Sequence, residues 1–191
     1  MLMSIRARRE RERAERERLI VAAARELAEA EGWDAVTTRR LAEQIEYSQP
    51  VLYSHFSGKD AIMAAVALEG FAELAAALRT ARRSASGPRQ ALADVAAAYA
   101  AFAAQRPALY DAMFTHVVNL PFASPEAPAA LHAAFDELRR AMQPVADDDL
   151  ETLAETFWSG LHGLLTLMRN GRLRSEEHQR RLALLIRRFS T

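Results

Sequence analysis

The side chains with the most readily interpreted chemistry lie between Gln49 and Lys59. Leu52 and Phe56 are four residues apart, so on a helix they share one face and must turn towards a core. The other positions form an outer surface of polar, small and aromatic side chains: Gln49, Pro50, Val51, Tyr53, Ser54 and His55. A glutamine amide can hydrogen-bond to base edges, and Pro50 or Val51 can contact a thymine methyl group. Tyr53, His55 and Lys59 carry donors that can reach phosphates, so the segment suits double-stranded DNA.

Patterns typical of an enzyme, a cofactor site or a metal site are missing from the sequence. There is no Gly-x-Ser-x-Gly, no phosphate-binding glycine loop and no compact carboxylate pair. The chain has no cysteine, which excludes a zinc ribbon, an iron–sulfur site and a thiol nucleophile. The histidines of the second half are scattered without an i, i+4 pair: His116, His132, His162 and His178. We therefore expect no enzymatic activity, no cofactor and no metal.

The composition predicts an all-α protein. The chain has 191 residues, of which 50% are apolar, and this is enough for one or two small domains. Alanine, the best helix former, occurs 40 times, whereas glycine and proline occur seven times each. No apolar run is long enough to span a membrane, and the charged N-terminus lacks the apolar segment of a signal peptide. We expect a cytoplasmic protein that does not enter a membrane.

Three short helices are predicted to hold the segment at Gln49. The first is clear from Leu19, follows a charged arm over residues 1–18 and is stopped by Gly32. The second is capped at Thr37 or Thr38, and Gln49-Pro50 opens the third after the three-residue turn Glu46-Tyr47-Ser48. A pair of helices joined by such a turn describes a helix-turn-helix, whose second helix enters the DNA major groove.

Residues 18–80 resemble the DNA-binding domain of the TetR (tetracycline repressor) family of bacterial transcriptional regulators. The resemblance lies in Thr37-Thr38-Arg39-Arg40-Leu41-Ala42, in the run from Tyr47 to Phe56, and in Lys59-Asp60. It implies an all-α homodimer, with a helix-turn-helix head over residues 1–57 and a ligand-binding and dimerisation bundle over residues 58–191. It also implies a cytoplasmic protein that lies on the nucleoid when bound to DNA. The implied DNA-binding residues are Thr38, Arg39, Gln49, Pro50, Val51, Tyr53, Ser54, His55 and Lys59.

Two features of the head do not follow the family pattern or a simple charge argument. Family members usually have glycine in the turn between the two helices, because a residue there takes a positive φ. This chain has Glu46, which costs roughly 1 kcal/mol if φ is positive. Bulk charge gives no basic signature either, because residues 1–60 hold 11 basic and 11 acidic side chains. The arm has seven arginines and four glutamates, and a DNA contact and a solvated helix are both open for it.

The second half is predicted to complete a set of about nine helices. A long helix opens at Ser57, and others follow over residues 88–106, from Pro107, and over 129–142, 150–169 and 175–189. Phe157-Trp158-Ser159-Gly160-Leu161-His162-Gly163 resembles the Trp-x-x-x-His-Gly signature of one C-terminal subgroup of the family. That helix is apolar on two sides and holds two glycines, which predicts a dimer interface. The predicted interface residues are Leu153, Gly160, Leu161, Gly163, Leu164, Met168, Leu182, Leu185, Ile186 and Phe189.

A small-molecule site is expected between the helices of the bundle. The candidate lining residues, for each of which core packing is the alternative role, are Phe71, Tyr99, Phe102, Met113, Phe114, Phe157, Trp158 and His162. Because the sequence shows no convergent cluster of charges, we expect an apolar or neutral effector. The predicted protein is then a repressor that leaves a palindromic operator when the effector binds. A helical small-molecule-binding protein or enzyme without a DNA role, and a purely structural dimerisation module, are the alternatives.

Overall fold

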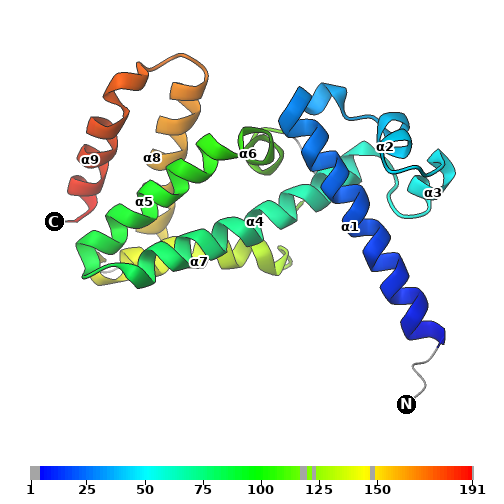
Figure 1. Ribbon diagram of the computed structural model, residues 1–191. Helices are drawn as coiled ribbons and strands as arrows, with labels where there is room; N and C mark the ends of the chain where they lie inside the picture. The colour runs from blue at the N-terminus through cyan, green and yellow to red at the C-terminus, as the bar shows by residue number, and fades with distance from the viewer. Residues whose placement is uncertain (1–4, 117–119, 122–123, 147–148, 191) are drawn as a thin grey trace. The chain divides into compact units, whose positions relative to one another are not determined.

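The protein is built from helices, as the composition predicts. The computed structural model describes residues 5–116, 120–121, 124–146 and 149–190, and this part of the chain contains nine α-helices and no strand. Figure 1 shows their course from the N- to the C-terminus. The helices are α1 Ile5–Glu31, α2 Thr38–Gln44, α3 Gln49–Tyr53, α4 Lys59–Ser84, α5 Pro88–Gln105, α6 Pro107–Phe114, α7 Ala129–Met142, α8 Leu150–Arg169 and α9 His178–Phe189, with short 3-10 turns η1 Trp33–Ala35, η2 Gln143–Val145 and η3 Ser175–Glu177.

The chain forms two compact units. Unit 1 consists of Met1–Gly70 and Arg106–Ser124, and unit 2 consists of Phe71–Gln105 and Pro125–Thr191. The division therefore falls inside α4, between α5 and α6, and between Ser124 and Pro125, and not at residues 57 and 58. The predicted boundary between residues 57 and 58 separates DNA binding from ligand binding and dimerisation, and it stays a prediction.

Helix α1 supplies the framework of unit 1. Ile20, Ala24 and Leu27 are spaced by four and three residues and are all buried, as an amphipathic helix requires. Gly32 ends the helix with a φ of 83°, a left-handed conformation that glycine adopts without a Cβ penalty. Residues 5–18 of the charged arm are continuous with this helix, because α1 begins at Ile5.

Helix α6 belongs to unit 1 because α1 and η1 hold its first turn. The Glu29 carboxylate accepts hydrogen bonds from the backbone N–H groups of Ala108, at 3.2 Å, and Leu109, at 3.0 Å. These N–H groups have no partner inside a helix, and a carboxylate there also complements the helix dipole. The Trp33 indole N–H donates to the Ala108 carbonyl at 2.7 Å. A Cβ at Gly70 of α4 would lie 2.6 Å from Met113 Sδ, so glycine allows this close approach of α6.

Unit 2 contains a buried ionic cluster that the sequence did not indicate. The side chain of Glu137 in α7 is fully buried, and it pairs with Arg79 at 3.0 Å, Arg82 at 2.8 Å and Arg140 at 2.9 Å. Burial acts to raise the pKa of Glu137, but the hydrogen bonds from Arg82 and Arg79 outweigh it and hold the pKa below its usual value. The expectation that no charges converge is therefore wrong, because the cluster joins residues far apart in the sequence.

Helix boundaries in unit 2 agree closely with the sequence pattern. α7 spans Ala129–Met142 and α8 spans Leu150–Arg169, as predicted. Asp149 caps α8, because its carboxylate accepts the Thr152 N–H at 3.0 Å. The two preceding aspartates of the sequence, Asp147 and Asp148, lie outside the described residues. Among the described helices, α4 has the length and apolar composition of a membrane span, but half of its apolar window is buried, as in a core helix.

Glu137→Gln tests the ionic cluster. The substitution keeps the shape of the side chain and removes the counter-ion of three arginines, so we expect the free energy of unfolding at pH 7 to fall by about 2–4 kcal/mol in urea denaturation. Because the folded-state pKa is depressed, this stabilisation is present above the unfolded pKa of about 4.3 and is lost as the pH falls through the folded pKa. The difference from the wild type should therefore shrink in acid.

The matched control is Asp136→Asn on the same helix. Asp136 is 36% exposed and pairs with Arg139 at 3.0 Å, so its loss should cost less than about 1 kcal/mol. Equal losses in the two variants would contradict a special role for Glu137.

Candidate nucleic-acid interface

Helices α2 and α3 form the predicted helix-turn-helix in unit 1, beside α1 (Figure 1). The Thr37 hydroxyl caps α2 by accepting the Arg40 N–H at 3.2 Å, which confirms the predicted start of the helix. Pro50 lies in the first turn of α3, where its missing N–H costs no intrahelical bond. Leu52, with 1% of its surface exposed, anchors α3 in the core.

The turn between the two helices depends on Glu46. Its φ is 56°, and it is the one residue other than glycine with a positive φ in the described part of the chain. Tyr47 N–H then donates to the Ala42 carbonyl at 2.9 Å, which closes the end of α2. The sequence left open whether this position takes the left-handed conformation, and the structure shows that it does, at the cost of backbone strain.

The outer surface of α3 carries the side chains that the sequence placed there. Gln49, Pro50, Tyr53 and Ser54 are exposed, Val51 is partly exposed, and 54% of the Tyr53 surface is accessible. The Tyr53 hydroxyl lies 3.3 Å from the Thr38 hydroxyl at the start of α2, so the two groups lie next to each other on the surface. Arg39 is exposed beside Thr38 and pairs with Glu43 at 3.0 Å. We call Thr38, Gln49, Pro50, Val51, Tyr53 and Ser54 the reading face.

His55 does not lie on this outer surface, and that expectation is wrong. α3 ends at Tyr53, so the helical spacing that would place His55 outside stops before it. Its side chain is only 6% exposed, and Nδ1 lies 3.4 Å from Glu17 Oε1 of α1. Partial desolvation acts to raise the pKa of Glu17, but hydrogen bonds from Arg13 and His55 hold it below its usual value. His55 therefore fixes the end of α3 to α1.

Lys59 is also held by the protein. Its ammonium group donates to the Trp33 carbonyl at 2.5 Å, which ties the first residue of α4 to η1. An ammonium group has three donors, and two of them have no partner among the residues that the structure describes. A phosphate contact by Lys59 stays a prediction, now next to a structural role that the sequence did not indicate.

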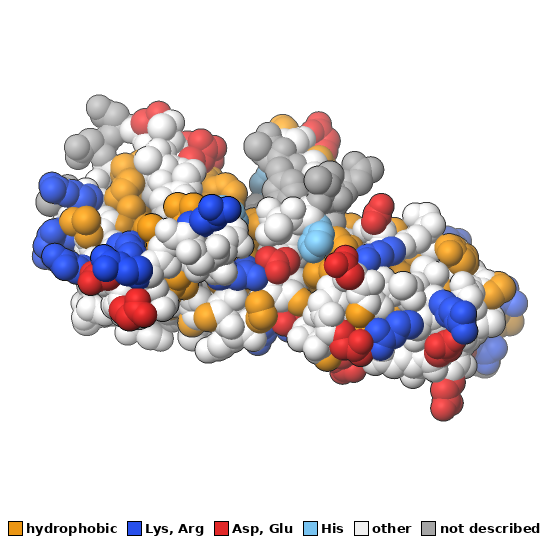
Figure 2. Space-filling view, turned by 90° about the horizontal axis from the view of Figure 1, so that it is seen from above, with side chains coloured by type: hydrophobic (Ala, Val, Ile, Leu, Met, Phe, Trp, Pro, Cys, Tyr) orange, Lys and Arg blue, Asp and Glu red, His pale blue; other side chains and the backbone are white. Residues whose placement is uncertain are grey.

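Charge on the surface is mixed. Figure 2 shows basic and acidic side chains side by side over the face that it draws. Many of these charges are ion pairs one turn apart, such as Arg6 with Glu10 and Arg13 with Glu17. A DNA-binding surface in this protein must therefore come from local placement of arginines, because the net charge is zero.

The residues predicted to line a ligand site fall into both units. Met113 and Phe114 belong to unit 1, whereas the other six belong to unit 2: Phe71, Tyr99, Phe102, Phe157, Trp158 and His162. All but Phe114, Trp158 and His162 are buried, as plain core residues are. The structure brings three of the set together, because the Trp158 indole N–H donates to the Tyr99 hydroxyl at 2.9 Å and that hydroxyl lies 3.5 Å from His162 Nδ1.

Thr166 completes this network and was missed from the sequence, although it follows His162 by one helical turn. Its hydroxyl lies 3.3 Å from His162 Nε2. Burial and, secondarily, the charge of Arg169 lower the pKa of His162, so the imidazole is neutral at pH 7. The result is a neutral, partly buried polar group within an apolar bundle.

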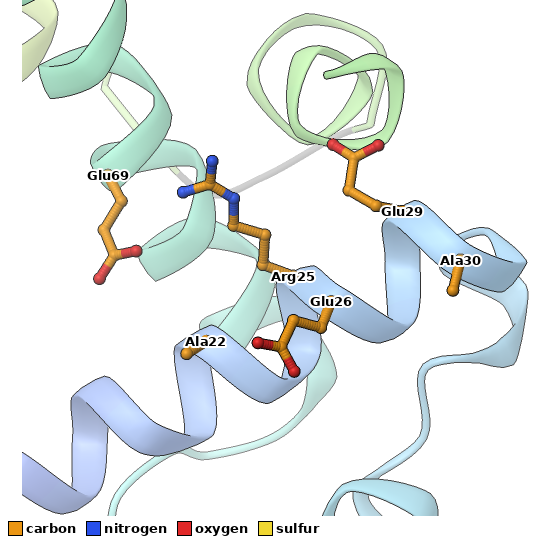
Figure 3. A pocket seen from close by; sticks show the side chains of 6 residues that line it. All are labelled: Ala22, Arg25, Glu26, Glu29, Ala30 and Glu69. Carbon is orange, nitrogen blue, oxygen red and sulfur yellow. The ribbon is translucent and has the colours of Figure 1, made fainter. Parts of the chain in front are cut away.

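A pocket of about 630 Å³ in unit 1 is lined by other residues: Ala22, Arg25, Glu26, Glu29, Ala30 and Glu69. Figure 3 shows the Arg25 and Glu69 side chains pointing toward one another. The Glu29 side chain points to α6, whose first backbone N–H groups donate hydrogen bonds to its carboxylate. Glutamates supply half of this lining, and none of the predicted ligand residues takes part. The pocket does not match the apolar effector site expected from the sequence.

The predicted dimer residues divide into a core set and a surface set. Leu161 and Leu182 are only 1% and 5% exposed, so both are core residues of unit 2, and their assignment to an interface is wrong. A Cβ at Gly160 would lie 2.9 Å from Leu185 Cδ1, so α9 of the same chain explains that glycine. Near Gly163, by contrast, the space is open. The remaining interface candidates, each partly exposed, are Leu153, Leu164, Met168, Leu185, Ile186 and Phe189.

Comparison with known proteins decides the family. Residues 20–66 match the family described as bacterial regulatory proteins, tetR family, and residues 92–189 match the tetracyclin repressor-like C-terminal domain. The chain belongs to the TetR family. The first match spans α1 from its first buried residue, both helices of the helix-turn-helix and the start of α4, and the second reaches from α5 to the end of α9.

Individual relatives agree with this assignment. An uncharacterized HTH-type transcriptional regulator of Mycobacterium tuberculosis is 30% identical over 155 residues, which are 80% of this chain and 69% of that protein. The uncharacterized HTH-type transcriptional regulator YobS of Bacillus subtilis is 32% identical over 101 residues, about half of either chain (53% and 52%). A solved structure of a protein with unknown function from Rhodococcus sp. RHA1 has a TM-score of 0.75 and 27% identity, covering 91% of this chain and 92% of that one.

Glu46→Gly tests the strain in the turn. Glycine adopts a φ of 56° without a Cβ clash, so we expect the free energy of unfolding to rise by about 0.5–1 kcal/mol after the entropy of the unfolded chain is included. Urea denaturation measures the change. Glu46→Ala is the control, because it removes the same carboxylate but keeps the Cβ. If alanine stabilises the protein as much as glycine does, the effect comes from charge and not from the backbone.

Proposed function

We propose that this TetR-family regulator is a ligand-responsive repressor that binds a palindromic operator as a homodimer. The reading face carries the proposal: Leu52 and His55 fix α3 from the inside, while Gln49, Pro50 and Tyr53 are turned outward. This surface offers each kind of group that a major-groove contact uses. The Gln49 amide suits base edges, Pro50 and Val51 suit thymine methyl groups, and the Tyr53 hydroxyl suits phosphates. The site of action is the bacterial cytoplasm, on the nucleoid when bound to DNA.

The homodimer is proposed to form through α8 and α9. Leu153, Leu164 and Leu167 lie on one side of α8 at spacings of eleven and three residues, and 46% of the Leu167 surface is exposed. Gly163 lies on the same side with open space before it. Two copies of this helix pair would form a four-helix arrangement about a two-fold axis and cover these side chains. Two α3 helices about 34 Å apart then match successive major grooves.

The effector is proposed to be apolar or neutral and to bind in unit 2. Tyr99, Trp158 and His162 provide a polar group inside an apolar bundle, and the lowered pKa of His162 keeps it uncharged. Such sites combine a mostly apolar lining with a few placed polar groups. Ligand binding makes the protein release the operator only to the extent that the ligand binds the state without DNA affinity more tightly than it binds the DNA-binding state.

Gln49→Ala tests sequence reading by α3. Loss of one bidentate base contact should raise the Kd for the operator about tenfold and leave the Kd for an unrelated duplex unchanged, so sequence preference relaxes. Tyr53→Phe should weaken binding to both duplexes equally, because it removes a phosphate donor. Gel shifts with the intergenic DNA beside the gene measure both effects.

The matched control for Gln49→Ala is Gln90→Ala, an exposed glutamine of α5 that pairs with Asp94 at 2.7 Å. It should bind both duplexes as the wild type does. Unaltered sequence preference in Gln49→Ala would show that α3 does not read the operator, and an absence of DNA binding by the wild type would exclude the proposed function.

Leu167→Arg tests the dimer. The side chain is already 46% exposed, so the fold should tolerate arginine, whereas burial of two such charges at a two-fold axis should shift the protein to monomers in analytical ultracentrifugation. Leu19→Arg is the control, because Leu19 is 44% exposed in unit 1 and should leave the oligomeric state unchanged. A Leu167→Arg protein that sediments as the wild type would place the interface elsewhere.

A further inference from the structure

The buried face of α1 continues toward the N-terminus as a stripe of arginines. Ile20, Ala23 and Leu27 follow the spacing of three and four residues that keeps one helix face, and they are 0%, 5% and 6% exposed. The same spacing carried backward from Ile20 gives four positions, and every one of them is arginine: Arg16, Arg13, Arg9 and Arg6. We call these four residues the arginine stripe. The face that packs against the head therefore changes from apolar to basic without changing direction.

The helix carrying the arginine stripe extends past the core of unit 1. None of the residues from Ile5 to Leu19 is buried, whereas Ile20 is fully so. The last point of attachment is Glu17, which meets His55 just after the end of α3 at 3.4 Å. From Glu17 back to Ile5 the helix advances by about 18 Å at 1.5 Å per residue. This length of helix therefore starts at the end of α3 and extends away from the core of unit 1.

The charges of this segment are available for a partner. Arg6 and Arg13 are paired with Glu10 and Glu17, but such exposed pairs one turn apart contribute only about 0.3–0.5 kcal/mol each and exchange easily. Arg9 and Arg16 have no ion-pair partner among the residues that the structure describes. The opposite side of the helix holds Arg11 and Arg18, which also lack one and share the seven-residue spacing. Arg9 and Arg16 therefore match Arg11 and Arg18 in charge and in spacing, and the two pairs lie on opposite sides of the helix.

We propose that the arginine stripe binds phosphates of the DNA duplex outside the operator half-site that α3 reads. This inference rests on the proposed function and extends it. With α3 in the major groove, a helix that begins at its end and keeps its head-facing side toward the duplex lies along the sugar–phosphate backbone. Its length corresponds to about five base pairs at 3.4 Å each. Phosphate contacts carry no base information, so the stripe adds affinity and salt dependence but no sequence preference.

The double variant Arg9→Gln with Arg16→Gln tests this contact against Arg11→Gln with Arg18→Gln. Both remove two unpaired charges at the same spacing, and glutamine keeps the helix propensity of arginine. In the stripe variant we expect the Kd to rise about fivefold to tenfold for operator and unrelated duplexes alike, and the slope of log K against log salt to fall by about 1.8, or 0.9 for each lost phosphate. The variant of the opposite side should keep the wild-type Kd and slope. Equal far-UV circular dichroism of the two variants excludes loss of helix.

Duplex length provides a second, independent measurement. A duplex trimmed to the operator half-sites has no outer phosphates, so the wild type should bind it no more tightly than the stripe variant binds the full-length duplex, and the two proteins should bind the trimmed duplex with the same Kd. Wild-type Kd and slope in the stripe variant, with Gln49→Ala still relaxing sequence preference, would overturn the arginine stripe and leave the proposed function intact. Equal losses in both double variants would reduce the effect to net charge and overturn it too. An unchanged DNA slope together with tight binding of the wild type to phosphatidylserine vesicles would assign the stripe to a membrane surface instead.

Discussion

The packing of α1 is the constraint on which unit 1 depends. One side of this helix buries Ile20 and Leu27, Glu17 holds the end of α3 through His55, and Glu29 holds the first turn of α6. Apolar burial supplies most of the stabilisation, while the two carboxylates set where the neighbouring helices stop and start. Because a helix is a rigid rod over this length, the position of α6 and that of the reading face are fixed by the same element. A ligand that displaced α6 would therefore act on α3 through α1.

DNA recognition by this protein does not need a basic domain. Charges balance over residues 1–60, and a count of charges gives no sign of a nucleic-acid partner. The position of each charge around α1 is more informative than the count. Glutamates spaced four residues from arginines neutralise part of the surface, whereas Arg9 and Arg16 lie on the helix face that continues the buried face of α1. Electrostatic attraction falls off over about 8 Å at physiological salt, so in the proposed complex the charges close to α3 would act on the duplex and the net charge of the chain would not.

The sequence predicted what local rules determine. The Thr37 cap and the boundaries of α7 and α8 follow from neighbouring residues, and they are confirmed. It could not predict that His55 turns inward or that Arg79 and Arg82 reach Glu137, because these depend on contacts between residues 38 or more positions apart. The candidate site was predictable only in part. The exposed side of α3 followed from the spacing of its residues, whereas the position of α3 in unit 1 depends on contacts with residues far away in the sequence.

Two glycines of α8 show how a structure separates roles that a sequence leaves alike. Gly160 and Gly163 each cost about 1 kcal/mol relative to alanine in a helix interior, so each calls for a compensating contact. Gly160 has one within the chain, since Leu185 of α9 fills the place that a Cβ would occupy. Gly163 has none, and a Cβ there would meet open space. Its cost is compensated if a second chain approaches α8 on that side, next to the exposed Leu167. Gly163 is therefore the position in α8 that the proposed homodimer would account for and that the single chain does not.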